Sequence, residues 1–502
     1  MARVEQRDAT ADDLADAGGV FGNRSFVYLW SAQVLSQLVS NMVLAALMAT
    51  ISETTDSNTA VAALVLTFLV PAVLFSTLGG VLVERGDAKV IMLATNVARA
   101  VGTILFIFVA PGLDRAIVPL VYLINFLVAS ATAFFAPAEL TAIPRVVDRR
   151  NLLAANSIFV LTINATFAVG FGFFGPLLLI AAGPIAVYVV VAAMFGLAAI
   201  AILPLPGVPP ERERHTVELA GRAVRQLVTE LGEGAAFVRR HGEIFWSLVY
   251  LGIAASLIGV VGAIGPGFAR EILRLTSQDF FFIMGPAGLG AVLGILFLNS
   301  YARRVPRRLL IDIGLVGMGL TGLALALVRP ITTLVAPAVA PIEDVLPTLA
   351  PLTSLIAVVV VIAVFAGIEY ALVAIPAQTA LAEELPTEVR GRIFGILNTL
   401  LSVASFFPVI AAPAAADVLN ILFPGAGIPV VLGFLGLLTM WAGIASWRRN
   451  ASRGLHRHDQ EPSVVPTPPP SHPIGPMGVV PGSRQSTAPA RRPKRSVPAD
   501  GD

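Results

Sequence analysis

Long apolar stretches separated by short polar turns follow one another along most of this chain. A helix needs about 20 predominantly apolar residues to cross a bilayer. The stretches lack the period-two alternation expected for the wall of a membrane barrel. The pattern therefore predicts an all-α membrane protein with twelve transmembrane helices, at Ser25–Ile51, Ala60–Val83, Val90–Ala110, Ile117–Pro137, Leu153–Ala181, Pro184–Leu203, Ile244–Phe268, Phe280–Ser300, Leu309–Val328, Leu352–Ala377, Ile393–Ala416 and Ile428–Trp447.

The longest polar connection in the first 250 residues divides these helices into two groups of six. Apolar residues recur in it at three- and four-residue intervals from Val217 to Val238, with arginines between them. This spacing predicts an amphipathic helix on the membrane surface or, alternatively, a solvated linker helix. The predicted domains are an N-terminal segment (1–22), a six-helix bundle (23–204), the linker (205–243), a second six-helix bundle (244–449) and a tail (450–502).

Arginine and lysine gather in alternate connections between the predicted helices. One set of connections contains Arg85, Lys89, Arg145, Arg149, Arg150, Arg303, Arg304, Arg307, Arg308, Arg390, Arg392, Arg448 and Arg449. The opposite set contains Arg115, Arg270, Arg274 and Arg329. Because short loops rich in these residues stay in the cytoplasm, the alternation predicts a multi-pass protein of the cell (inner or plasma) membrane with both termini cytoplasmic.

The composition excludes a series of soluble domains. Charged residues make up 13% of the 502 residues, whereas soluble domains are about a quarter charged. Without cysteine, disulfides and thiolate metal sites are excluded. The polar N-terminal segment lacks the features of a signal peptide, so we expect the first helix to be retained. The Pro- and Ser-rich tail is predicted to be disordered, and its basic cluster, Arg491–Arg495, either contacts anionic lipid or stays solvated.

The polar turn Gly79–Lys89 joins the second and third predicted helices. Its glycines would let two helices approach closely at the membrane boundary. Its charges are placed where they could hold a neighbouring helix, although the same residues could form only a tight polar hairpin.

The two groups of six helices resemble each other. Pro137-Ala138-Glu139 ends the fourth predicted helix, and Pro376-Ala377-Gln378 ends the tenth. In each half, a second proline, an arginine-bearing turn and a helix with an early asparagine follow. Two such repeats are typical of secondary transporters, whose substrate site lies at the midplane and is exposed alternately to the two sides.

The turn resembles the signature loop of the major facilitator superfamily, written G-x-L-a-D-r-x-G-r-k. The matching stretch runs from Gly80 to Lys89, with Glu84 where aspartate is usual and Ala88 in place of a basic residue. The resemblance implies that Glu84 engages the start of the eleventh helix and keeps the cytoplasmic gate closed. The residues that it assigns to this gate are Gly80, Glu84, Arg85, Asp87, Lys89, Arg390 and Arg392.

Four further stretches resemble the branch that contains the enterobactin exporter and macrolide-efflux-like proteins. They are Asn23–Ser36, Thr95–Ala100, Leu231–His241 and Leu385–Phe394. The resemblance implies a monomeric exporter that uses no cofactor and is not an enzyme. It does not identify the substrate.

Few ionisable residues fall inside the predicted helices, where each costs roughly 2.5–3.5 kcal/mol on insertion scales. Glu369 is the one carboxylate that the pattern places deep in the bilayer. It could couple transport to protons or bind a cation, or it could be hydrogen-bonded in a helix contact. Arg99 could neutralise a partner acid or extend to the membrane surface, and the resemblance favours a structural role. Asp312, close to Arg307 and Arg308, is expected to form a boundary ion pair.

Uncharged polar residues gather in the first half. The cavity candidates are Gln33, Gln37, Asn41, Asn125 and Asn164. The first three share one helical face, and the alternative for all five is interhelical hydrogen bonding. Six phenylalanines could line an apolar cavity or pack against helices and lipid: Phe134, Phe135, Phe167, Phe171, Phe173 and Phe174.

Other chemistry finds no support in the sequence. Gly288–Gly294 resembles a dinucleotide loop but lies inside a predicted helix, where close helix packing explains it better. No phosphate-binding loop is present, which argues against a built-in ATPase. All five histidines lie outside the predicted helices, so histidine relays and metal sites are not expected.

The sequence thus predicts a proton-coupled exporter of an amphipathic small molecule of the drug or siderophore class, working by alternating access. A lipid or lysolipid transporter or a uniporter is one alternative, and a transport-inactive membrane scaffold or sensor is another. The expected partners are a small-molecule substrate, protons and membrane lipids, with no nucleic acid and no metal.

Overall fold

The computed structural model describes residues 19–109, 112, 114–208, 232, 238–301, 305–334, 355–384 and 390–452. The predicted N-terminal segment before residue 19, most of the linker and the tail from residue 453 lie outside the described residues. The described part of the chain is helical, and no strand occurs in it. Residues 1–460 form one compact unit.

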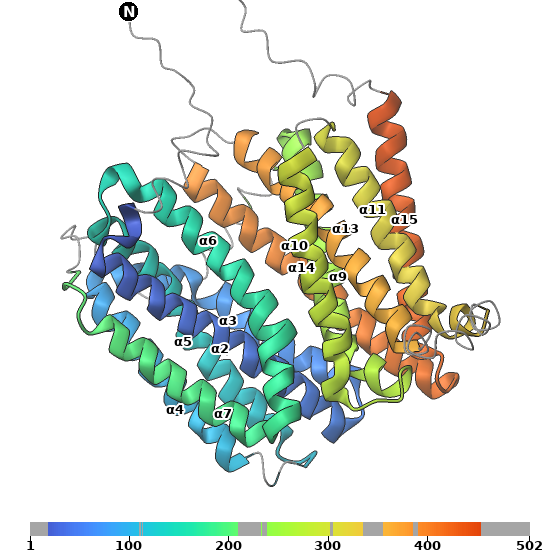
Figure 1. Cartoon of the computed structure of the whole chain (residues 1–502), viewed down its shortest axis with the longest axis horizontal. Helices are drawn as coiled ribbons and strands as arrows, with labels where there is room; N and C mark the ends of the chain where they lie inside the picture. Colours follow the sequence, from blue (N-terminus) through green and yellow to red (C-terminus); the bar gives the residue numbers. More distant parts are fainter. Residues whose placement is uncertain are drawn as a thin grey trace, which may run out of the picture. The chain divides into compact units, whose positions relative to one another are not determined.

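The first half contains six long helices, and a short π-helix, η3, interrupts their order (Figure 1). They are α2 (Arg24–Thr55), α3 (Asn58–Arg85), α4 (Ala88–Val109), α5 (Val118–Val146), α6 (Leu152–Val169), η3 (Gly170–Phe174) and α7 (Gly175–Ile202). The long helices of the second half are α9 (Gly242–Glu271), α10 (Phe281–Tyr301), α11 (Arg307–Ala326), α13 (Leu355–Glu384), α14 (Arg390–Leu422) and α15 (Gly427–Ser452).

Eleven described segments are long and apolar enough to span a membrane. One of them, Ala154–Ile202, is 49 residues long and covers two predicted helices. Gly183 breaks it with a φ of 78°, which suits glycine, and Pro184 follows. The segment therefore accounts for two crossings. The prediction of an all-α membrane fold with twelve transmembrane helices is confirmed.

Corresponding helices pack in the same way in the two halves. In the first half α3 packs on α5, and α4 packs on both α5 and α7. In the second half α10 packs on α13, and α11 packs on both α13 and α15. These are the same pairs, counted from the start of each six-helix group, so the sequence repeat is also a repeat of packing.

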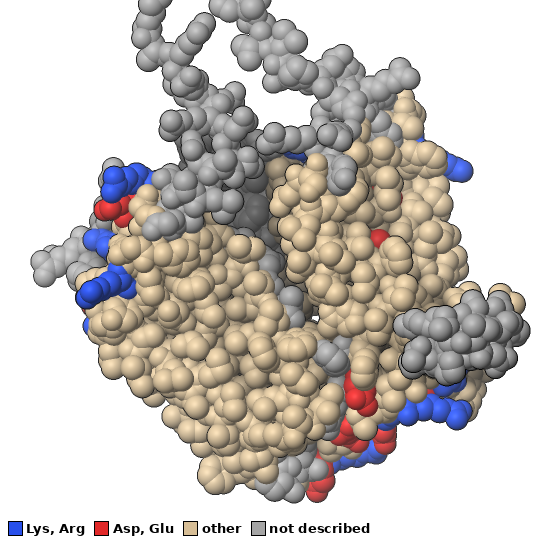
Figure 2. All heavy atoms as spheres, viewed as in Figure 1, with Lys and Arg blue, Asp and Glu red and all other residues tan. Residues whose placement is uncertain are grey.

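The surface of the described residues matches a lipid environment. Figure 2 shows a broad region over both halves that is almost without charge and has one small acidic spot within it, with arginine, lysine and acidic side chains near opposite edges. Large apolar side chains are exposed on the described part of the chain, including Phe108, Phe407 and Ile421. Because such patches are rare on soluble monomers, they indicate contact with lipid.

Glycines allow the closest helix contacts. A Cβ atom at Gly290 of α10 would lie 1.9 Å from the carbonyl oxygen of Val364, and one at Gly367 of α13 would lie 1.9 Å from that of Ala287. The glycine-rich stretch Gly288–Gly294 is therefore a helix-packing surface, in agreement with the sequence interpretation.

Gly79 and Gly80 of the signature turn differ in how closely a neighbouring helix approaches them. A Cβ atom at Gly79 would lie 2.9 Å from Cγ of Pro137 on α5, whereas one at Gly80 would meet nothing within 4 Å. The expected close approach is thus found at Gly79 and not at Gly80.

Candidate functional site

The two halves meet along several helices. Helix α3 packs against α9 and α14, while η3 and α6 pack against α10. Between residues that the structure describes, the hydrogen bonds that join the halves lie at one end, where α2 leads into α3. We call this the Asp417 end.

Asp417 of α14 binds the beginning of α3. One of its carboxylate oxygens accepts from the backbone nitrogen of Asn58 at 3.1 Å and from Nδ2 of Asn58 at 2.8 Å. The other accepts from Oγ of Ser57, from the nitrogen of Thr59 at 2.8 Å and from Oγ1 of Thr59. One carboxylate therefore holds five donors at the positive end of a helix dipole in the opposite half.

Arg270 of α9 makes a second contact between the halves. Its guanidinium donates to the carbonyl oxygen and the hydroxyl of Ser52 on α2, and it lies 3.4 Å from the carboxylate of Asp56. The neighbouring Glu271 accepts from Nδ2 of Asn420 at 3.2 Å, which ties α9 to α14 within the second half.

Aromatic and small residues complete this contact. Phe171 of η3 packs edge-to-face on Phe280, with ring centroids 5.8 Å apart. A Cβ atom at Gly172 would lie 3.2 Å from the carbonyl oxygen of Met284 on α10. A π-helix is rare and frequently occurs at functional sites, and here it lies where the halves touch.

Sequence reasoning missed Asp417, Arg270 and Glu271. The predicted helices ended at Ala416 and Phe268, so these residues counted as boundary charges. In the structure α14 continues to Leu422 and α9 to Glu271. The signal in the sequence was the presence of charges within one or two turns of a span end, which does not reveal what they contact.

The signature loop is described in part. Asp87 accepts from the backbone nitrogen of Lys89 at 2.8 Å and from that of Val208 at 3.0 Å. It therefore caps the start of α4 and holds the chain that follows α7. The side chains of Glu84, Arg85, Arg390 and Arg392 lie outside the described residues, so the predicted contact of Glu84 with the start of α14 stays a prediction.

Glu369 lies on α13 and points toward α11. A Cβ atom at Gly317 of α11 would lie 2.8 Å from its carboxyl carbon, and Thr321, one turn along α11, offers it a hydroxyl. Its Oε2 is buried without a hydrogen-bond partner among the described residues. Because α11 packs on α13 and α15, Glu369 sits in a helix contact within the second half.

A second intramembrane acid corrects the sequence analysis, which placed only Glu369 deep in the bilayer. Glu139 is 5% exposed, because α5 continues through Pro137 to Val146 and carries it inside the bundle. Arg99 of α4 lies close enough to Glu139 for their charges to interact, although no hydrogen bond joins them in the described structure. Arg99 is 1% exposed and so does not reach the membrane surface.

The guanidinium of Arg99 is held between aromatic rings. Its Cζ lies 4.6 Å from the ring centroid of Phe135 and 4.9 Å from that of Phe195. Its NH2 group donates to Oδ1 of Asn96 at 2.8 Å. Oε1 of Glu139 and Nε of Arg99 are buried without a hydrogen-bond partner among the described residues. The arrangement ties α4, α5 and α7 together.

Two of the five polar candidates of the first half contact neighbouring helices, and a third bonds within its own helix. Gln33 is buried, and its Nε2 lies 3.5 Å from the carbonyl oxygen of Phe159 on α6. Asn41 donates to the carbonyl oxygen of Gln37 in its own helix at 2.9 Å. Asn125 donates to Oγ1 of Thr67 on α3 at 2.8 Å. The side chain of Asn164 lies outside the described residues.

We expect Asn125 and Thr67 to couple weakly. A double-mutant cycle with Asn125→Leu and Thr67→Val should give a coupling free energy of about 0.6 kcal/mol, as is usual for hydrogen bonds between membrane helices. Unfolding of the purified protein in mixed micelles would measure it. A coupling of zero would show that this contact adds nothing to the packing of α3 on α5.

Asp312 of α11 is hydrogen-bonded to residues of the neighbouring helix α15. It accepts from Oγ of Ser446 at 2.5 Å and from Nδ2 of Asn450 at 3.0 Å, both on α15. Ser446 in turn lies 2.7 Å from the hydroxyl of Tyr250 on α9. This buried network fixes the end of α15 against α11 and α9.

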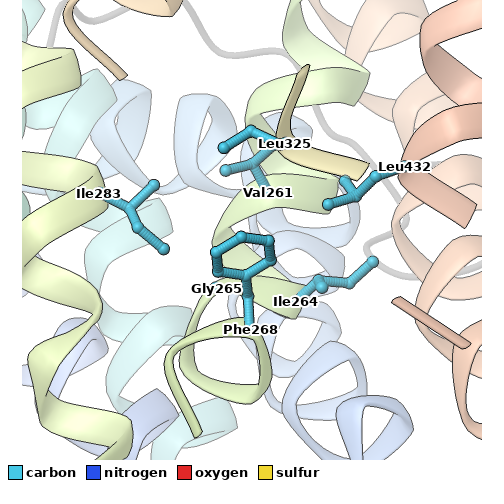
Figure 3. Close-up of a pocket in the computed structure, with 7 residues that line it drawn as sticks. All are labelled: Val261, Ile264, Gly265, Phe268, Ile283, Leu325 and Leu432. Atoms are coloured by element: carbon cyan, nitrogen blue, oxygen red, sulfur yellow. The ribbon is translucent and has the colours of Figure 1, made fainter. Parts of the chain in front are cut away.

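The phenylalanines have different surroundings. Phe135 is buried beneath Arg99, and Phe171 lies between the halves. Phe173 and Phe174 are exposed on the lipid-facing surface. Figure 3 shows a small apolar pocket inside the second half, lined by Val261, Ile264, Gly265, Phe268, Ile283, Leu325 and Leu432. Its volume of about 10 Å³ has room for no more than one water, so it is not the substrate cavity.

Comparison with known proteins identifies the fold. The sequence profile described as Major Facilitator Superfamily matches residues 29–409. No curated protein matches the chain. Among solved structures, the nucleoside transporter NupG has 12% identity and a TM-score of 0.61, and the alignment covers 84% of this chain and 99% of that one.

Two further structures are similar at comparable identity. The POT family transporter PepTSo has 13% identity and a TM-score of 0.60, with 86% of this chain and 99% of that chain covered. A bacterial homolog of the human lysosomal transporter Spinster, in an inward-facing and unoccupied conformation, has 14% identity and a TM-score of 0.55, with 88% and 99% covered. At these identities the likeness establishes the fold alone.

Proposed function

Because this chain belongs to the Major Facilitator Superfamily, whose members are transporters and not enzymes, we propose that it is a secondary active transporter and, more narrowly, a proton-coupled exporter of an amphipathic small molecule. It works by alternating access, in which the two six-helix halves rock about a central substrate site.

The observation that carries this proposal is the polar contact between the halves at the Asp417 end. It consists of hydrogen bonds that Asp417 accepts from residues of the first half and of hydrogen bonds that Arg270 donates to that half. Contacts of this kind can break and reform as units. A structure closed at one end by such bonds suits a protein whose halves separate there during each cycle.

The chemistry of the contact surface supports an amphipathic substrate. Phe171, Phe280 and Met284 meet between the halves, and Met48 of α2 approaches Gly262 of α9. Inside the first half, Oε1 of Gln33 is buried between α2 and α6 without a hydrogen-bond partner among the described residues. An apolar surface with a few polar groups is typical of small-molecule sites. The drug or siderophore class rests on the sequence resemblance.

Glu369 is the proposed coupling acid. Its position against Gly317 favours an indirect role, in which gain or loss of a proton changes how α13 packs on α11. Replacing it with glutamine removes the titration and keeps the shape.

We expect Glu369→Gln to abolish substrate-driven proton movement. The purified protein in liposomes would be given lipophilic cations, macrolides and catechol siderophores while internal pH is recorded. Asp114→Asn, a change at an exposed carboxylate that accepts hydrogen bonds from the neighbouring backbone, is the control and should leave proton movement intact.

Other outcomes would favour the alternatives. Transport without proton movement in both the wild type and Glu369→Gln would contradict coupling and favour a uniporter or a lipid or lysolipid transporter. A protein that neither binds nor moves any of these compounds or a labelled lysolipid would favour a transport-inactive scaffold or sensor.

A further inference from the structure

Helices α3 and α14 lie side by side and run in opposite directions. The N-terminal residues of α3 contact Asp417, which is five residues before the end of α14. All five donors to Asp417 belong to three consecutive residues, Ser57, Asn58 and Thr59. A small separation of the two helix ends would therefore break all five hydrogen bonds together. The contact thus has two states, formed and broken.

The partial exposure of the contact suits an opening reaction. Asp417 is half-buried and Thr59 is exposed. When the ends separate, water can bond to the carboxylate and to the donors, so opening does not leave unpaired groups in an apolar core. A fully buried carboxylate with five donors would be too costly to release, and a fully exposed one would hold weakly.

A glycine of the second half leaves room for the side chain of Asn58. A Cβ atom at Gly267 of α9 would lie 2.0 Å from Oδ1 of Asn58, so only glycine admits this side chain. Asn58 is 2% exposed, although it begins a helix at the end of the bundle. Arg329 donates to the carbonyl oxygens of Glu271 and Ile272 and so fixes the end of α9 close to Gly267 and Asn58.

We propose that Asp417 is the latch of a gate at this end: its bond to the start of α3 sets the equilibrium between closed and open forms in the transport cycle. The inference rests on the proposed alternating-access function, and it assigns a gating role to a residue that carries no substrate. Replacing Asp417 should shift the equilibrium between the closed and open forms without preventing folding.

The gate can be measured directly because the chain contains no cysteine. Spin labels on Ala116→Cys and Phe423→Cys would occupy exposed positions at the Asp417 end, one in each half. Electron–electron resonance on the purified full-length protein gives the distribution of distances between them, and no substrate is needed.

We expect the ratio of closed to open form to fall about tenfold or more in Asp417→Asn, since a hydrogen bond to a charged group contributes at least that factor to the equilibrium constant. Thr59→Val, which removes one exposed hydroxyl donor and no charge, should produce a smaller shift in the same direction. Asp279→Asn is the matched control, because Asp279 bonds only locally to Thr276 in the described structure and should leave the distances unchanged.

An unchanged distance distribution in Asp417→Asn, with a normally folded protein, would overturn the latch. The same shift in Asp279→Asn would overturn it as well, because loss of any acidic charge at this end would then suffice. If Asp417→Asn is poorly folded, Thr59→Val decides: a shift supports the latch, and its absence contradicts it. Failure of the transport assay with a clear shift in distances would instead contradict the proposed function and leave the gate standing.

Discussion

Replacing Glu139 by glutamine while Arg99 remains is expected to destabilise the first half by about 1–3 kcal/mol, because Arg99 then stays buried without a nearby opposite charge. The loss is smaller than for a direct buried ion pair, since no hydrogen bond joins the two side chains. Arg99 is 1% exposed between the rings of Phe135 and Phe195 and cannot reach water by a change of rotamer alone.

The double variant Glu139→Gln with Arg99→Gln should be markedly more stable than Glu139→Gln alone. Removing both charges of a buried pair is often neutral, since the cost of burying them disappears together with their attraction. The cation–π contacts and the bond to Asn96 are lost in the double variant, so we expect recovery of part of the stability and not all of it.

Unfolding of the purified variants in mixed micelles would measure these differences. The matched control is Arg150→Gln, because Arg150 and Asp148 form a pair 3.9 Å apart that is 83% and 75% exposed. An exposed pair of this kind contributes about 1 kcal/mol or less. Equal effects of Glu139→Gln and Arg150→Gln would contradict a buried charge pair that holds α4 to α5.

Substituting alanine at Gly367 is expected to have the second large effect. In most helices a change from glycine to alanine stabilises by up to about 1 kcal/mol. Here the new Cβ would lie 1.9 Å from the carbonyl oxygen of Ala287, and backbone cannot move aside as a side chain can. Helices α10 and α13 would have to separate, at a cost of about 1–3 kcal/mol or more.

Gly196→Ala provides the control for this change. Gly196 lies inside α7, and a Cβ there would meet nothing within 4 Å, so we expect no loss of stability. The unfolding transition and the yield of folded protein after purification would compare the two variants. If Gly367→Ala behaved like Gly196→Ala, the close contact between α10 and α13 would be incorrect.

The two predictions differ in what the sequence could reveal. The glycines of α10 were recognised as helix packing from their place inside an apolar stretch. Glu139 was not recognised, because the apolar stretch appeared to end at Pro137. In the structure α5 continues through Pro137 and Pro144. Proline costs less in a membrane helix because neighbouring helices and side chains satisfy the freed backbone groups.

Hydropathy, charge alternation and internal repetition are local or periodic properties, and the sequence by itself therefore determined the twelve transmembrane helices and predicted their division into two groups. The family followed from the resemblance of Gly80–Lys89 to a signature loop. Nothing in those patterns reports which face of a helix an isolated acid occupies. Only the tertiary structure buried Glu139 beside Arg99, turned Glu369 toward Gly317 and brought Asp417 to Ser57, 360 residues away in the chain. Such contacts depend on how the helices pack. A hydrogen bond between residues so far apart in the chain does not produce a periodic pattern in the sequence.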